Sequence, residues 1–216
     1  IKMTIKVNGR VLPNEDHMTH VIPRYPGIVK TIHKRLGDSV AKDEVVAVVE
    51  SNESLRPYEV KSSIAGTVIG KDVRQGEFVK EGEVIYYVAD LTTVWVDLNV
   101  HRKDFDRLKV GEAVTIFADE GMTNATGLVS YISPFGAEDT QTMLARVELP
   151  NPTGTWLPGL FVTGEILVEE AEVPLAVRTS ALQTFRDWDV VFMKDGSMFE
   201  IAILELGRRD AEWVEV

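Results

Sequence analysis

The chain has 216 residues, 44% of them hydrophobic and 26% charged, which is the composition of a globular protein rather than a disordered one. Its 34 acidic and 23 basic residues give a formal net charge of −11, which argues against nucleic acid as a partner and against flat adsorption onto an anionic membrane. Because the chain contains no cysteine, disulfides, thiolate metal sites and thiol nucleophiles are excluded.

Residues 1–20 begin as a strand, because Ile1, Met3, Ile5 and Val7 alternate with polar side chains. We assign this segment either to the β-barrel or to the last domain described below. Both ends of the chain lie in strand-like stretches, which indicates a piece of a longer protein, so a missing leader sequence carries no information on location. No stretch approaches the ~18 consecutive apolar residues of a membrane-spanning helix.

Residues 21–90 contain one strand-and-turn unit written twice, in residues 22–51 and 61–90. Equivalent positions are 39 residues apart, and they include Gly27 and Gly66, Gly37 and Gly76, Val40 and Val79, and Glu44 and Glu83. We interpret the four glycines as turn residues with positive φ and the β-branched residues between them as strands. Two units are too few for a solenoid, so they predict a closed, pseudo-symmetric flattened barrel like those of biotinyl and lipoyl domains.

Residues 91–170 predict a second small domain, a β-barrel. Apolar and polar residues alternate over 94–100, and turn signals that include Pro158 and Gly159 separate further short strands over 113–117, 127–132, 142–149 and 160–168. Residues 101–110 are the best helical candidate, with Gly111 placed to end it.

Residues 171–216 carry further strands, over 190–193, 199–206 and 213–216, but too few to close a domain. We interpret them as a partial β domain, which the N-terminal strand would complete if it does not join the barrel. The predicted fold class is therefore mostly β, with small domains in tandem.

In this order the segments resemble the periplasmic adaptors, or membrane fusion proteins, of tripartite efflux pumps of the resistance–nodulation–division (RND) class, and most of all their heavy-metal branch. The two glycine-containing halves are similar to the two lipoyl halves of such adaptors. The remaining resemblance lies in three segments, namely Ala89–Val96 at the start of the barrel, Leu157–Val162 near its end, and Val173-Pro174 with Ser180–Leu182 at the crossing into a membrane-proximal domain.

The resemblance implies a subunit that is not an enzyme and that lies in the periplasm, held at the inner membrane by a segment outside this chain. Its implied partners are an inner-membrane RND transporter, an outer-membrane channel and further copies of itself in a ring. The implied cargo is a heavy-metal cation. An adaptor of a drug exporter or of an ABC-type transporter remains an open alternative.

The join between the two halves departs from the family pattern. Most adaptors insert a long α-helical hairpin there, whereas this join spans only residues 51–62, and its Pro57 disfavours a helix. We expect a short, ordered tip, with Leu55, Arg56 and Tyr58 as candidate residues for docking a partner.

No cofactor is expected. Biotinyl and lipoyl carriers present a modified lysine at this turn, but Glu53 lies near that position and Lys61 lies beyond the turn. The chain also has no nucleophile elbow, phosphate loop or His-Glu-x-x-His motif, so we assign no catalytic residue.

His17, His20 and His101 are candidate metal ligands, because imidazole binds zinc and copper. The spacing of His17 and His20 brings their rings together on a helix or turn but separates them on a strand. A second hypothesis is therefore a periplasmic module that binds Zn, Cu or Co transiently and delivers or senses the exported ion.

Overall fold

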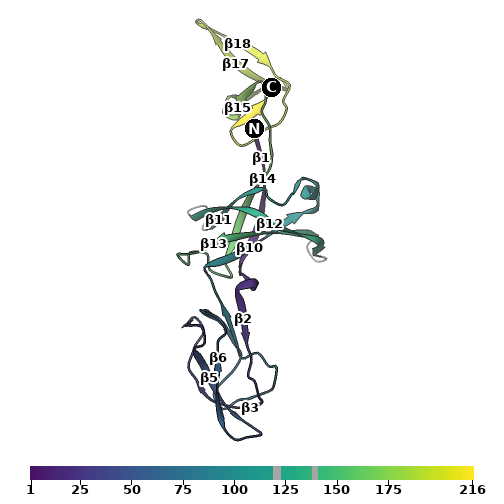
Figure 1. Ribbon diagram of the computed structural model, residues 1–216. Coiled ribbons are helices and arrows are strands. Elements are labelled where there is room, and N and C mark those ends of the chain that lie inside the picture. The colour runs from purple at the N-terminus through teal and green to yellow at the C-terminus, as the bar shows by residue number, and fades with distance from the viewer. Residues whose placement is uncertain (119–122, 138–140) are drawn as a thin grey trace. The chain divides into compact units, whose positions relative to one another are not determined.

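The computed structural model describes residues 1–118, 123–137 and 141–216, and strands predominate in it (Figure 1), which confirms the mostly β fold class. The strands of the first half of the chain are β1 (Lys2–Pro13), β2 (Met18–Val21), β3 (Gly27–Ile32), β4 (Ser39–Val40), β5 (Val45–Ser51), β6 (Pro57–Lys61), β7 (Gly66–Lys71), β8 (Phe78–Val79) and β9 (Tyr86–Ala89). Those of the second half are β10 (Thr93–His101), β11 (Ala113–Ala118), β12 (Thr123–Ala137), β13 (Thr142–Pro150), β14 (Phe161–Glu170), β15 (Ala176–Arg178), β16 (Gln183–Phe185), β17 (Trp188–Asp195), β18 (Met198–Ile203) and β19 (Trp213–Glu215).

The described residues divide into two compact units. One comprises Arg10–Asp97 and Arg146–Phe161, and the other comprises Ile1–Gly9, Leu98–Ala145 and Val162–Val216. Strands β1, β10, β13 and β14 contribute to both, and with β11 and β12 they form a closed barrel in the order β1-β10-β13-β12-β11-β14. The N-terminal strand thus belongs to the barrel, which is one of the two places predicted for it.

The duplicated segment forms two four-stranded sheets, β2-β9-β7-β4 and β6-β5-β3-β8. The two halves exchange their short strands, because β4 of the first half pairs with β7 and β8 of the second half pairs with β3. The registers are equivalent, since Gly27 pairs with Val79 and Gly66 with Val40. This exchange gives both halves one core, whose fully buried side chains include Val29, Val46, Val49, Val68, Ile85 and Val88.

The repeat begins earlier than the sequence suggested. The same offset of 39 residues relates β2 to β6, and each is an edge strand, β2 beside β9 and β6 beside β5. Val21 and Val60 occupy equivalent buried positions at the ends of these strands. Residues 18–20 therefore belong to the lipoyl-like domain, not to the N-terminal segment. The boundary was missed because β2 is short and has one fully buried side chain to mark it.

Two of the four repeat glycines are turn residues. Gly37 and Gly76 have φ of 88° and 83°, and their amides donate to Val68 O and Val29 O at 2.8 and 2.7 Å. Each turn thus holds the opposite half, and glycine accepts this left-handed backbone without steric cost.

The prediction of a turn was wrong for Gly27 and Gly66, which begin β3 and β7. Glycine is needed at both positions because the backbone of a neighbouring strand lies too close to leave room for a Cβ atom. A Cβ on Gly27 would lie 2.0 Å from the carbonyl oxygen of Glu50, and one on Gly66 would lie 2.4 Å from that of Ala89.

The predicted helix over 101–110 is a six-residue 3-10 helix, η2 (Arg102–Arg107), followed by Gly111 with φ 93°. Two other short 3-10 helices in the described ranges are η1 (Glu15–His17) and η4 (Thr179–Ala181). The turn at Pro158 and Gly159 is present, with φ of 100° at the glycine. The last segment forms a two-stranded sheet, β15-β19, and a three-stranded sheet, β16-β17-β18.

Candidate docking site at the β5–β6 turn

The join between the lipoyl-like halves is an ordered β-hairpin. Strands β5 and β6 pair up to Glu50 and Pro57, and the Ser51 amide donates to Arg56 O at 3.0 Å. The Leu55 amide donates back to Ser51 O at 2.9 Å, which closes the turn over residues 52–56. Pro57 fits at the start of β6, a position where a strand tolerates a missing amide donor. The predicted short tip without a helix is therefore present.

Leu55 has a strained backbone conformation in this turn. Its φ is 55°, a left-handed value that costs a non-glycine residue about 1 kcal/mol, and its side chain is 72% exposed. An exposed leucine in a strained backbone contributes no core packing to its own domain. Strain of this kind is concentrated at functional sites, which makes Leu55 the first candidate for contact with a partner.

The loop between β2 and β3 is held to the turn by hydrogen bonds. The Asn52 amide donates to Pro26 O at 3.0 Å, and the hydroxyl of Tyr58 donates to Tyr25 O and accepts from the Tyr25 amide at 3.2 Å. The two tyrosine rings meet edge to face at 5.8 Å, and burial raises the pKa of Tyr58. Tyr58 therefore anchors the loop, whereas Tyr25, 47% exposed, is available to a partner.

We call Arg24, Tyr25, Leu55 and Arg56 the tip patch. All four are exposed, and the Arg24 guanidinium lies 5.6 Å from the ring centroid of Tyr25. Neither arginine has an ion-pair partner within the described ranges. Tyrosine and arginine are, with tryptophan, enriched at interface hot spots. Sequence reasoning missed Arg24 and Tyr25, although an aromatic residue in a proline-flanked loop was a usable signal.

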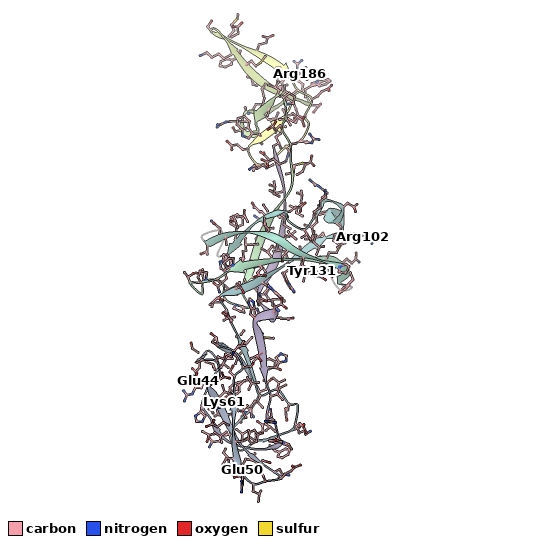
Figure 2. All side chains as sticks on the ribbon, in the orientation of Figure 1. Glu44, Glu50, Lys61, Arg102, Tyr131 and Arg186 are labelled. Atoms are coloured by element: carbon pink, nitrogen blue, oxygen red, sulfur yellow. The ribbon has the colours of Figure 1, made fainter. Side chains whose placement is uncertain are left out.

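Residues 52–56 of the turn include no lysine, the residue that carries biotin or lipoate in carrier domains. Glu53 lies in the turn, with its amide directed to Ser51 Oγ at 3.3 Å. Lys61 is the last residue of β6, and its Nζ lies 3.0 Å from Glu59 Oε2. Glu50 lies next to the turn, where it pairs with Pro57, whereas Lys61 pairs with Val45 at the other end of the two strands. Figure 2 labels both residues and shows their separation.

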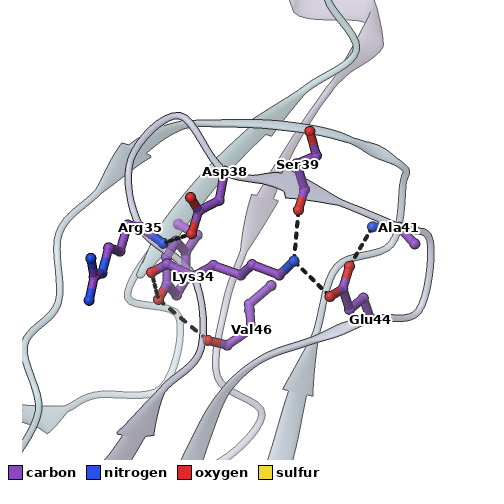
Figure 3. Close-up of polar contacts among 8 residues, drawn as sticks. Lys34, Arg35, Asp38, Ser39, Ala41, Glu44 and Val46 are labelled. Carbon is purple, nitrogen blue, oxygen red and sulfur yellow. Dashed lines mark hydrogen bonds and ion pairs between the residues drawn. The ribbon is translucent and has the colours of Figure 1, made fainter.

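A polar cluster fixes the loop between β3 and β5 of the same domain (Figure 3). Lys34 Nζ donates to Ser39 O and to Glu44 Oε1, both at 2.7 Å, while Glu44 Oε2 accepts from the Ala41 amide. The lysine hydrogen bond and the Ala41 amide hold the pKa of Glu44 below its usual value. Tyr86 donates to Lys34 O at 2.9 Å, and burial raises its pKa to about 12. In the second half Val73 stands in place of Lys34, so this cluster stabilises one half and is not a repeated functional site.

The three histidines have separate surroundings. His17 Nδ1 lies 3.0 Å from Thr93 Oγ1, and the His20 ring packs edge to face on Tyr87 at 5.0 Å. His101 is exposed at the end of β10. Within residues 1–118, 123–137 and 141–216, no three His, Asp or Glu side chains are grouped so as to hold a metal ion.

Models of three protein families match successive parts of the chain. A CzcB-like barrel-sandwich hybrid domain matches residues 17–90, a CusB-like β-barrel domain matches 93–169, and a CzcB C-terminal circularly permuted SH3-like domain matches 175–216. The chain belongs to the CzcB-like periplasmic adaptors. The first match begins one residue before β2, in agreement with the extended repeat.

Two curated relatives of this adaptor are the cation efflux system protein CzcB of Alcaligenes sp. (strain CT14), 26% identical, and the cobalt-zinc-cadmium resistance protein CzcB of Cupriavidus metallidurans, 25% identical. Both comparisons cover 100% of this chain and 55% of the relative, so the adaptor chain spans about half the length of these proteins. The crystal structure of ZneB from Cupriavidus metallidurans shares the fold, with a TM-score of 0.69 and 18% identity over 78% of this chain and 100% of ZneB. Among the described residues of the adaptor, no helix is long and apolar enough to cross a membrane.

Proposed function

We propose that this adaptor is the periplasmic subunit of a tripartite efflux system, in which it links an inner-membrane RND transporter to an outer-membrane channel for export of a heavy-metal cation. The observation that carries the proposal is the order of the three β domains, each matched by a model of the adaptor family. The heavy-metal cargo is supported by the names of the two CzcB relatives.

The role is mechanical rather than catalytic. Several small domains in one chain allow simultaneous contacts with more than one partner, and such multivalent binding raises the effective concentration of each partner near the other. Copies of the chain in a ring would multiply these contacts. The partner at the lipoyl-like end is proposed to bind the tip patch, because a turn of five residues leaves no helical hairpin for this task.

Complementation tests the proposal. A strain lacking the full-length gene is expected to lose tolerance to zinc, cobalt or cadmium and to regain it when the gene is restored. Unchanged metal tolerance together with a loss of drug tolerance would instead assign the adaptor to a drug exporter. No change in either tolerance would contradict an efflux role.

A further inference from the structure

The three-stranded sheet β16-β17-β18 exposes a large apolar surface. Strand pairing defines its two faces, because residues directly opposite one another in an antiparallel pair point to the same side and neighbours in a strand alternate. Phe185 pairs with Trp188, Phe192 with Ile201, and Val190 with Ile203. One face therefore carries six apolar side chains between 43% and 68% exposed, which we call the aromatic face: Phe185, Trp188, Phe192, Phe199, Ile201 and Ile203.

Formal charges are segregated between the two faces. Lys194 pairs with Phe199 and so lies on the aromatic face, and the Arg186 guanidinium lies 5.3 Å from the Phe185 ring centroid at its edge. The carboxylates of the two longer strands lie on the opposite face, where Asp189 pairs with Thr184, Glu200 with Met193, and Asp195 with Met198. Figure 2 labels Arg186 next to this sheet, and Figure 1 shows β17 and β18 extending beyond β15.

We propose that the aromatic face lies on a lipid bilayer surface, with its rings at the headgroup boundary. Tryptophan and phenylalanine beside lysine and arginine are the residues that occupy this boundary, because the rings displace acyl chains while the cations reach phosphates. The distribution of charge favours lipid as the occupant. Lys194 on the aromatic face and Arg186 at its edge complement phosphate, and the carboxylates of β17 and β18 are directed away from this face. Asp187, which follows Arg186 in the turn, adds one carboxylate beside that edge.

The net charge of −11 opposes adsorption of the chain as a whole to anionic lipid. The affinity must therefore come mainly from burial of the aromatic face, with the two cations offsetting the repulsion locally. Binding is expected to phosphatidylcholine vesicles and to mixed phosphatidylcholine–phosphatidylglycerol vesicles, and added salt should strengthen binding to the anionic mixture by screening the remaining negative charge.

Trp188 provides a direct readout. It is 60% exposed on the aromatic face, whereas Trp95 and Trp156 are buried at 8% and 5% exposure. In a Trp213→Phe background, vesicles with brominated acyl chains should quench Trp188 emission and shift it to the blue. A Trp188→Phe variant should show neither change.

Phe192 and Met193 offer a matched pair, because they are neighbours on opposite faces with 48% and 50% exposure. Phe192→Asp should lower the vesicle partition coefficient about tenfold or more, the effect of losing one buried aromatic side chain. Met193→Asp should leave it within about twofold. Both side chains are exposed, so both variants should fold, and their thermal midpoints provide the check. The proposal is overturned by an absence of vesicle binding, by equal loss in the two variants, or by binding only to a detergent-solubilised membrane protein.

Discussion

Asp97 and Arg146 form a two-pronged ion pair, with Arg146 Nε 2.7 Å from Oδ1 and Nη2 2.9 Å from Oδ2. The guanidinium also stacks 3.7 Å from the ring centroid of Trp95. The side chain of Asp97 is 10% exposed and that of Arg146 is 24% exposed. The pair therefore joins the adjacent barrel strands β10 and β13 by an interaction that is largely shielded from water.

Removing one partner of this pair should be costly. Asp97→Ala is expected to lower the free energy of unfolding by about 3 kcal/mol, because it leaves the guanidinium shielded and without its carboxylate. Chemical denaturation measures the change. The control is Lys6→Met, which removes an exposed ion pair of 3.7 Å with Glu165 and should cost less than about 0.5 kcal/mol. Equal effects of the two substitutions would show that the Asp97 pair contributes no more than a surface contact.

Glu44 makes the lipoyl-like domain sensitive to acid. Its pKa is lowered in the folded state, so its contribution is present above the ordinary glutamate value of about 4.3 and is lost as the pH falls through the folded pKa. Glu44→Gln should therefore lower the thermal midpoint at neutral pH, and the difference from the unsubstituted protein should shrink as the pH falls below about 4.

Glu83 is the matched control for this pH experiment. Its Oε2 accepts from the Lys80 amide at 2.8 Å, as Glu44 accepts from Ala41, but valine replaces the lysine partner at position 73. Glu83→Gln should produce a smaller change at neutral pH. A larger effect at Glu83 than at Glu44 would contradict the role assigned to Lys34.

Gly27 should tolerate no side chain. Alanine there would place Cβ 2.0 Å from the Glu50 carbonyl oxygen, and backbone must move to relieve the contact, so we expect a loss of at least about 2 kcal/mol in unfolding free energy. Gly37→Ala meets no atom within 4 Å and pays only for its left-handed backbone, about 1 kcal/mol. Denaturant midpoints would contradict this account if Gly37→Ala were the more destabilising change.

The tip patch should be needed for export but not for folding. Leu55→Asp or Arg56→Glu is expected to lower the highest metal concentration at which cells grow by about tenfold or more, because each substitution removes one contact of the proposed docking site. Purified variants should keep their thermal midpoint. Leu36→Asp, at a 66% exposed position of the same domain, is the control and should leave tolerance unchanged. Normal export by the Leu55 and Arg56 variants would remove the tip from the account.

The duplication was readable from the sequence because local chemistry repeats in it. Gly37 and Gly76 hold equivalent turns, and the offset between them extends to the strand pairing of both halves. The close approach at Gly27 was not readable, since it depends on where another strand places a carbonyl group. The pairing of Asp97 with Arg146, 49 residues apart, was missed for the same reason. The metal-binding role of His17, His20 and His101 stays a prediction.

The adaptor role is tested most directly by affinity purification of the full-length protein from its own membranes after crosslinking in living cells. An inner-membrane transporter and an outer-membrane channel should both be recovered, and Leu55→Asp should selectively reduce recovery of the channel. Recovery of neither protein, with the adaptor itself intact and abundant, would contradict the proposed function.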